Sequence, residues 1–333
     1  MRVFITGGTG FVGSAVARQL LAAGHEVLAL VRSGSDKRML DGMPVERVLG
    51  DLSQVDILSR GMSGCQWVFH VAALYSYWGH GWEDFQQANV DGTRNVLEAA
   101  SRSGIDRLVY TSSIAALGLN KDRTPADEHT PSMLEDMITP YKRSKFLAEE
   151  IAQKYARDGL PVVIVNPSTP VGVGDHKPTP SGQIIVDYLN GRMFGYVNTG
   201  LNLVDVEDVA AGHLLAAERG HVGERYILGG ENLTLKQMLD LLAEVSGLPV
   251  VRMRIPHGIA LTWSYVDTLL ARNLPGRVPA ATPDKVRLSY RYEFFDSSKA
   301  HNELGMPNTP VRTALQKAVE WYRANGYAPK GNG

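Results

Sequence analysis

The sequence has little cysteine, no long apolar run and no excess of charge of either sign. Cys65 is the only cysteine, which excludes an internal disulfide bond and is typical of a reducing compartment, so we expect a cytoplasmic protein. The longest apolar stretch, 258–271, contains Asp267 and is too short to span a membrane, and no signal peptide is visible. With a formal net charge of −1, we expect no nucleic-acid partner, no membrane-surface partner and no stable membrane insertion.

The composition that remains fits one or two globular domains. The chain has 333 residues, of which 44% are hydrophobic and 21% are charged. Short apolar strands alternate with helical segments, which predicts an α/β fold with a doubly wound parallel sheet. The expected strands of the first half are 2–6, 26–31, 45–49, 66–71, 107–111 and 161–166.

The alternation becomes less regular after residue 174. We expect residues 1–174 to form a nucleotide-binding domain, to which residues 201–229 return. Residues 175–200 and 230–333 are then expected to form a smaller, mixed α/β lobe that binds the substrate.

A glycine-rich turn follows the first expected strand at once. Gly7, Gly10 and Gly13 stand three apart, with Phe11 and Val12 between the last two, and helical periodicity follows. In a dinucleotide-binding turn, the first glycine permits the tight turn, the second lets the backbone approach a pyrophosphate, and the third lets the helix pack close to the strand. The helix N-terminus then offers free N–H groups to phosphate. The alternative is a plain tight turn.

Basic residues follow the second strand, where an acidic residue would favour NAD. Arg32 comes directly after the strand and Arg38 lies close behind. A guanidinium pairs well with a 2′-phosphate, so this pattern predicts NADP rather than NAD. The alternative is a solvated basic loop.

Two further strand ends supply candidate contacts for the nucleotide. Asp51 and Leu52 follow the third strand, and Asp51 is placed to accept from the adenine amino group. Its alternative role is a helix N-cap for residues from Ser53 onward. Ala72 and Ala73 follow the fourth strand, and their small side chains leave room for the cofactor to cross the sheet edge.

An aromatic segment lies just beyond these alanines. Tyr75, Tyr77, Trp78 and Trp82 occur within eight residues that glycines interrupt. Ligands bind at the carboxyl ends of parallel strands, so Tyr75, Tyr77 and Trp78 are expected to line a pocket for a bulky apolar or ring-containing substrate. A hydrophobic cluster under a loop is the alternative. We expect residues 84–103 to form one long helix after it.

The expected helix that begins at Pro140 carries the chemistry. Tyr141 and Lys145 are four residues apart and share one helix face, and Ser113 follows the fifth strand. A phenol titrates near 10, and a nearby ammonium lowers that pKa, so Lys145 is expected to make Tyr141 a better acid–base group. Ser113, or Ser112 less readily, would donate to the substrate oxygen. The alternatives are an ordinary surface helix and a strand-end turn. No metal site is expected.

At these motifs the chain resembles the extended short-chain dehydrogenases/reductases. The matching stretches are Thr6–Gly13, Gly50–Leu52, Tyr141–Lys145 and Asn166–Ser168. Within that family the sequence is most similar to dihydroflavonol-reductase-like proteins and to the bacterial hopanoid-associated sugar epimerase group. The resemblance implies a Rossmann domain with a seven-stranded sheet and a homodimer through two helices per subunit. It also implies cofactor contacts by Lys145, by Thr111 at the fifth strand end, and by Pro167 and Ser168 beneath the nicotinamide.

The resemblance to the sugar epimerase group and the residue after the second strand indicate different reactions. An epimerase of this family usually retains NAD and has an acidic residue where this chain has Arg32. We therefore predict NADP(H)-dependent reduction of a ketone or aldehyde on a bulky or sugar-derived, hopanoid-related small molecule. One alternative is an NAD-dependent nucleotide-sugar epimerase, and another is a non-catalytic NADP-sensing regulator.

Overall fold

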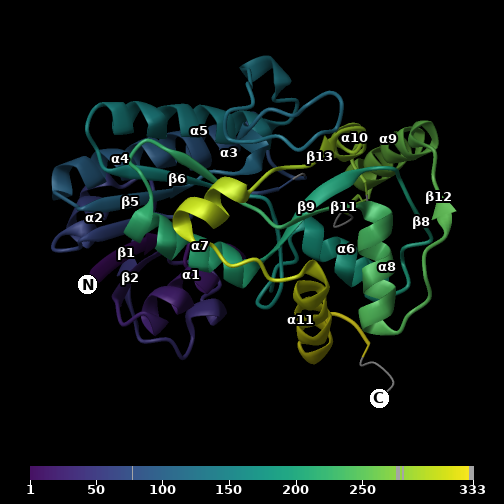
Figure 1. Ribbon diagram of the computed structural model, residues 1–333, viewed down its shortest axis with the longest axis horizontal. Helices are drawn as coiled ribbons and strands as arrows, with labels where there is room; N and C mark the ends of the chain where they lie inside the picture. Colours follow the sequence, from purple (N-terminus) through teal and green to yellow (C-terminus); the bar gives the residue numbers. More distant parts are fainter. Residues whose placement is uncertain (77, 275–277, 280, 330–333) are drawn as a thin grey trace.

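The first half of the chain, joined by one later strand, builds one parallel sheet, as predicted. The computed structural model describes residues 1–76, 78–274, 278–279 and 281–329. Seven strands run parallel in the order β10-β6-β5-β4-β1-β2-β3 (Figure 1). Their bounds are β1 (Arg2–Thr6), β2 (Glu26–Val31), β3 (Val45–Leu49), β4 (Trp67–His70), β5 (Arg107–Thr111), β6 (Val162–Pro167) and β10 (Arg225–Leu228).

Helices cover both faces of this sheet. Alternate strand residues face opposite sides, so Val3 and Ile5 belong to one apolar core and Phe4 to the other. The first face is covered by α1 (Phe11–Ala22) and α7 (Val206–Arg219). The second is covered by α2 (Val55–Met62), α4 (Gly92–Ser103) and α5 (Pro140–Arg157). Because both faces are buried, the central strands read as continuous apolar runs.

The second core also holds the single cysteine. The Cys65 side chain is buried, and its thiol donates to the Gly61 carbonyl at 3.6 Å. Burial raises the pKa of the Cys65 thiol, so this thiol is a poor nucleophile at neutral pH.

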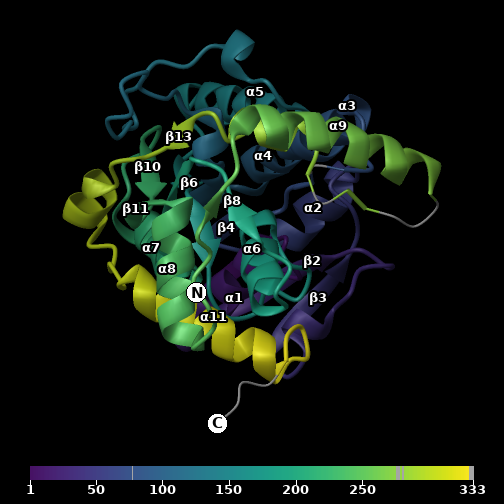
Figure 2. The ribbon, with the colours of Figure 1, turned by 90° about the vertical axis from the view of Figure 1, so that its right-hand side faces the viewer.

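Most of the segments after β6 build a second, smaller set of layers (Figures 1 and 2). One small sheet contains β7 (Thr169–Val171), β9 (Gly200–Asp205), β11 (Glu231–Thr234) and β13 (Tyr292–Glu293), and another pairs β8 (Gly195–Tyr196) with β12 (Met253–Arg254). Its helices are α6 (Pro180–Leu189), α8 (Leu235–Ser246), α9 (His257–Asn273), α10 (Pro283–Leu288) and α11 (Val311–Ala324).

Residues 201–229 divide between the two sets of layers. Helix α7 packs on the large sheet and β10 joins its edge. Strand β9 instead pairs with β7, β11 and β13 of the small sheet. The return to the large sheet therefore begins at Val206, where α7 starts.

The expected long helix 84–103 consists of three joined parts. These are α3 (Trp82–Phe85), a π-helical turn η2 (Gln86–Asp91) and α4. The remaining short turns are η1 (Arg38–Leu40), η3 (Ile114–Ala116), η4 (Leu134–Asp136) and η5 (Ala300–Leu304). No helix in the described part of the chain is both long and apolar enough to cross a bilayer.

Candidate active site

The glycine turn has the geometry that a dinucleotide-binding turn requires. Gly7 has a φ of 76°, and a Cβ there would lie 2.5 Å from the backbone nitrogen of Ala72. A Cβ on Gly13 would lie 2.1 Å from the Gly7 carbonyl oxygen. Gly10 is the N-cap of α1 and has no side chain to cap the helix. The first backbone N–H groups of α1 therefore have no side-chain hydrogen-bond acceptor from the N-cap residue. This cradle fits a pyrophosphate.

The basic residues after β2 differ in how they are engaged. Arg32 is exposed directly beyond the strand. The Arg38 guanidinium pairs with Asp36, at 2.9 Å between Nε and Oδ2. Arg38 is therefore partly neutralised by its neighbour, and Arg32 is the better candidate for a 2′-phosphate.

Asp51 and Leu52 lie at the end of β3, where adenine contacts were expected. One Asp51 carboxylate oxygen accepts from the backbone nitrogen of Ser53 at 3.1 Å. The N-cap of α2 is Gln54, so the alternative role of Asp51 as that cap is wrong. The Leu52 carbonyl accepts from the Asn95 side chain at 2.9 Å, which ties this turn to α4.

Helix α5 begins as predicted and positions Lys145 at the edge of the large sheet. Thr139 caps the helix by accepting from the backbone nitrogen of Lys142 at 3.2 Å, and Pro140 is its first residue. Lys145 Nζ donates to the carbonyl oxygen of Thr111 at 2.8 Å. Burial lowers the pKa of Lys145 to about 8, and the negative charge of Glu149 opposes this shift.

Tyr141 lies one turn before Lys145 among aromatic rings. Its ring centroid is 4.6 Å from that of Tyr75 and 6.4 Å from that of Phe85. Burial raises the pKa of Tyr141 to about 12, against the opposing effect of a hydrogen bond with Ser113. The expected lowering of this pKa by Lys145 is therefore wrong for the chain alone, because lost hydration of the phenolate dominates.

The serines and the threonine at the end of β5 have separate environments. Ser113 caps the short turn η3, and its hydroxyl accepts from the Ala115 nitrogen at 3.1 Å. The Thr111 hydroxyl pairs with Nε2 of buried His213 at 2.9 Å, so only the Thr111 carbonyl is directed to Lys145.

Three buried polar atoms gather at the carboxyl ends of β5 and β6. Within the described residues, Ser112 Oγ, Asn166 Oδ1 and Ser168 Oγ have no hydrogen-bond partner. Pro167 ends β6, and the Ser168 nitrogen donates to the Leu228 carbonyl at 3.0 Å. Buried polar atoms normally have partners, and this edge of a parallel sheet is where nucleotides bind. The strand ends therefore fit the amide and ribose of a nicotinamide.

The loop after β4 is held by a residue that the sequence did not single out. Asn89 lies in the π-helical turn η2 and is buried. Its amide accepts from the Leu74 nitrogen at 2.6 Å, donates to the Leu74 carbonyl at 3.0 Å and donates to Ser144 Oγ at 2.8 Å. In the sequence, the only indication of this role was that Asn89 is a polar amide among apolar helix positions.

The same loop carries the expected substrate contacts. Ala73 and Tyr75 are exposed, whereas Ala72 and Trp78 are half-buried. The Ser76 hydroxyl accepts from the Trp78 nitrogen and donates to the Trp78 carbonyl. Tyr77 lies outside the described residues. The ring contact between Tyr75 and Tyr141 places one expected substrate residue beside the expected acid–base group.

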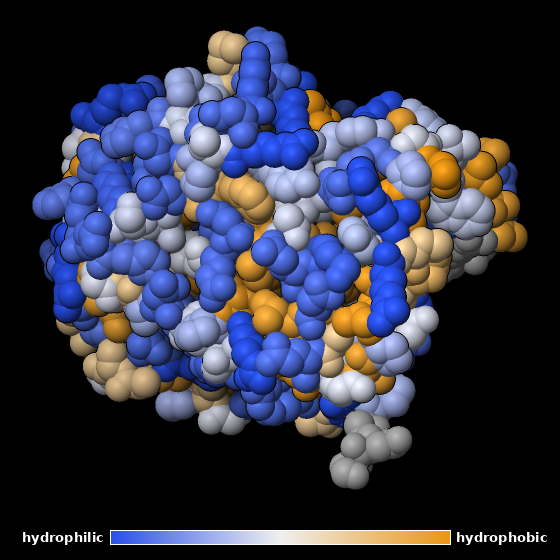
Figure 3. All heavy atoms as spheres, turned by 45° about the vertical axis from the view of Figure 1, so that its right-hand side comes forward, coloured by the Kyte–Doolittle hydropathy of each residue, from blue (hydrophilic) through white to orange (hydrophobic). Residues whose placement is uncertain are grey.

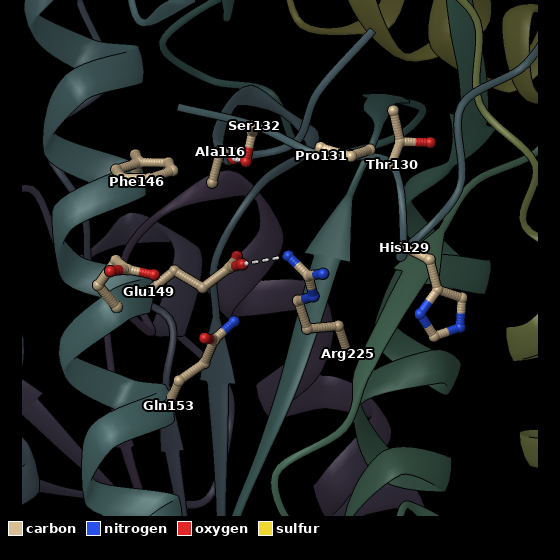
Figure 4. A pocket seen from close by; sticks show the side chains of 10 residues that line it. Ala116, His129, Thr130, Pro131, Ser132, Phe146, Glu149, Gln153 and Arg225 are labelled. Carbon is tan, nitrogen blue, oxygen red and sulfur yellow. Dashed lines mark hydrogen bonds and ion pairs between the residues drawn. The ribbon is translucent and has the colours of Figure 1, made fainter. Parts of the chain in front are cut away.

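Glu149 connects the site to a cavity farther along α5. Its carboxylate accepts from the Asn166 amide at 2.7 Å and pairs with Arg225 at 3.3 Å. The same Asn166 amide donates to the Ser113 carbonyl at 3.1 Å. The cavity measures about 210 Å³ and its wall is mostly polar, with the ion pair at its centre (Figure 4). Tyr141, Lys145 and Glu149 thus follow one another at four-residue intervals along one helix face.

The glycine cradle and the polar sheet edge together place the chain among NAD(P)-dependent Rossmann enzymes. A family model described as the NAD dependent epimerase/dehydratase family matches residues 3–229. The chain therefore belongs to this family, the extended short-chain dehydrogenases/reductases. Its members include oxidoreductases, epimerases and dehydratases.

Several curated relatives carry reductase names. A Synechocystis sp. protein named as dihydroflavonol 4-reductase-like is 47% identical, over 97% of this chain and 95% of the relative. Sterol demethylase protein B of Methylococcus capsulatus is 37% identical, over 98% and 99%. A 4-hydroxy-2-methyl-3-oxo-4-farnesyl-3,4-dihydroquinoline-1-oxide ketoreductase of Stigmatella aurantiaca is 33% identical, over 99% and 98%.

Solved structures share the whole fold. The crystal structure of gox2253 is 44% identical, with a TM-score of 0.88 over 98% of this chain and 99% of that chain. DesIV, a dTDP-glucose 4,6-dehydratase from Streptomyces venezuelae with NAD bound, is 26% identical, with a TM-score of 0.77 over 99% of each chain. These matches confirm the predicted seven-stranded Rossmann architecture.

Proposed function

We propose that the protein reduces a ketone or aldehyde on a bulky, largely apolar substrate with NADPH. The observation that carries this proposal is Tyr141 with Lys145 one turn along α5, at the sheet edge that fits a nicotinamide. The reductase names of the relatives, one of them for a farnesyl-bearing ketone, support reduction over epimerisation. The aromatic neighbours of Tyr141 suit an apolar substrate, and a hopanoid-related molecule belongs to that class.

Each residue has a defined part in this reaction. NADPH, when bound, supplies the hydride that reaches the carbonyl carbon. With a pKa of about 12, the Tyr141 phenol is protonated at neutral pH and can donate its proton to the substrate oxygen. Ser113 donates a hydrogen bond to the same oxygen. The Lys145 ammonium stabilises the phenolate that remains, until a proton from solvent restores the phenol.

A second candidate function is NAD-dependent epimerisation of a nucleotide sugar. It is favoured by the description of the family model and by the likeness to a nucleoside-diphosphate-sugar epimerase from Pseudomonas aeruginosa, 27% identical with a TM-score of 0.82. A non-catalytic NADP-sensing role is disfavoured by the presence of Ser113, Tyr141 and Lys145 together.

The test compares nucleotide oxidation by the purified chain and by Tyr141→Phe. Oxidation of NADPH should exceed that of NADH with a panel of apolar ketones and aldehydes. Tyr141→Phe should lower kcat at least about a hundredfold and leave the affinity for NADPH unchanged. Release of tightly held NAD on denaturation, identified by mass, together with no net NADPH oxidation, would favour the epimerase instead.

A further inference from the structure

Helix α9 has its polar side inward and its apolar side outward. Ser264, Asp267 and Ala271 are buried on one side. On the other side the large apolar side chains are between 39% and 63% exposed, namely Ile259, Trp263, Tyr265, Val266, Leu269 and Leu270. A helix of a globular protein normally shows the reverse arrangement. Figure 3 shows hydrophobic atoms gathered at the right-hand edge of the smaller lobe.

The inward side of α9 contacts the rest of the protein, so the helix holds its apolar side toward solvent. Asp267 accepts from the Ala281 nitrogen at 3.3 Å, and α9 packs against α10. Residues 259, 263, 266 and 270 recur at helical spacing and therefore form one continuous stripe. Together with Tyr265 and Leu269, these four residues make up what we call the α9 patch.

Two arginines lie beside the α9 patch. The only acidic residue of α9 is the buried Asp267, and the last turn carries the exposed Arg272. Arg287 of α10 reaches the patch, since its guanidinium donates to the Tyr265 hydroxyl at 2.6 Å. Arg287 also pairs with Asp284 of α10, at 3.4 Å between Nη1 and Oδ1. In the sequence, residues 250–291 hold seven lysines and arginines against two aspartates, whereas the whole chain has a net charge of −1. The near-neutral total thus hides a local basic excess.

We propose that the α9 patch docks on the surface of a bilayer that contains anionic phospholipid. An amphipathic helix with tryptophan and leucine on one side and arginine at its rim lies in the interfacial plane, with its apolar face buried roughly 5–10 Å deep. Anionic headgroups would pair with Arg272 and Arg287. The helix is too short to span a bilayer, so this is peripheral docking and not insertion.

The charge distribution favours a bilayer over a second copy of this chain. In a twofold dimer the same surface meets itself, so Arg272 and Arg287 of one copy would meet a surface whose exposed Asp284 is already paired with Arg287. A bilayer supplies the opposite charge and an apolar interior at once. This inference does not depend on the reaction proposed above.

Vesicle flotation tests the proposal with the full chain. The chain should float with vesicles of equimolar phosphatidylcholine and phosphatidylglycerol, and markedly less with pure phosphatidylcholine. Trp263→Ser and Leu269→Ser should each weaken binding by about tenfold, since each removes one large apolar side chain from the contact. Arg272→Glu should weaken binding to the anionic vesicles only. Tryptophan emission should shift to the blue on binding, and Trp263→Phe should abolish the shift.

Met133→Ser is the matched control, because Met133 is 63% exposed on a loop of the other lobe, as Ile259 is on α9. It should bind vesicles like the unchanged chain, and all variants should keep their thermal unfolding midpoint. Three results would overturn the proposal: no flotation, flotation that the α9 variants do not weaken, and equal binding to both vesicle types. Self-association that Trp263→Ser abolishes, without vesicle binding, would assign the patch to a second copy instead.

Discussion

At the residue scale, burial sets the protonation of the proposed acid–base pair, Tyr141 and Lys145. Tyr141 and Lys145 are shifted in opposite directions, to about 12 and about 8, because each loses hydration of its charged form. The spacing of the two residues was predictable from the sequence, since helix geometry alone brings them to one face. The directions of the two pKa shifts were not, because they depend on what packs around the helix from distant parts of the chain.

Glu149→Gln should move the pH dependence of turnover. Removal of the carboxylate takes away the charge that favours the Lys145 ammonium, so the pKa of Lys145 falls below about 8. Activity that needs this ammonium is lost as pH rises through that pKa, so the alkaline midpoint of kcat/KM should move to lower pH. Glu150→Gln, at the exposed neighbouring position on α5, should leave the midpoint in place. An unmoved midpoint in Glu149→Gln would show that the carboxylate acts only through packing.

Arg32→Asp should reverse the choice of cofactor. The substitution removes the cation expected to pair with a 2′-phosphate and supplies an acceptor for ribose hydroxyls. We expect KM for NADPH to rise at least about tenfold, the loss of one charge-assisted hydrogen bond, and KM for NADH to fall. Arg38→Ser is the control and should have a smaller effect, because Asp36 already pairs with Arg38. Equal effects of the two substitutions would refute the distinction between them.

At the scale of elements, the predictable features are the local ones. Strands β1, β2 and β3 and the start of α5 follow from apolar runs, glycine punctuation and Pro140, and all lie where expected. The π-helical turn in the middle of 82–103 was missed, because its periodicity differs too little from an α-helix over six residues. The role of the π-helical turn is visible only in the folded structure, where it places Asn89 to hydrogen-bond with both Leu74 and Ser144.

Asn89→Ala should loosen the loop that carries Tyr75. It leaves the Leu74 nitrogen and carbonyl without their side-chain partner, which costs roughly 1–3 kcal/mol of the free energy of unfolding for an unpaired buried group. Because Tyr75 in this loop contacts the Tyr141 ring, and Tyr75 is expected to contact the substrate, KM for the carbonyl should rise more than kcat falls. Asn95→Ala serves as the control on the same helix, since it contacts Leu52 on the adenine side and should affect KM for the nucleotide only. A loss of kcat alone in Asn89→Ala would contradict this role.

For the whole molecule, two buried histidines of the large sheet and its covering helix should make the fold sensitive to acid. His70 bridges Thr6 and Thr93, and His213 bridges Thr111 and the Val209 carbonyl. Burial lowers the pKa of His70 to about 3 and that of His213 to about 4. In the unfolded chain both bind protons below about 6.5, so the unfolded state takes up more protons in the window between these values.

The free energy of unfolding should therefore fall as pH falls from about 6.5 toward about 4. The slope from the two histidines together should approach about 2.7 kcal/mol per pH unit, on the basis of about 1.4 kcal/mol per proton. Urea denaturation at a series of pH values measures this slope. In His213→Gln the slope should be roughly halved, whereas substitution of the exposed His80 should not change it. A slope that His213→Gln does not alter would exclude this origin.

The homodimer implied by family resemblance stays a prediction at this scale. In the described residues, six of the strongly exposed large apolar side chains lie on α9. The net charge of −1 led us to expect no membrane-surface partner. A net charge summed over the chain does not show where the charged residues cluster. Only the fold brings Arg287 beside Tyr265.

The burial of the Cys65 side chain has a practical consequence for spectroscopy. Its thiol is buried and its pKa is raised, so maleimide and nitroxide reagents will react slowly with the unaltered chain. A cysteine introduced at an exposed position would then be the one readily labelled site. A spin label at residue 263 could report depth in a lipid phase, and one at residue 133 could report the opposite lobe, without first removing the native thiol.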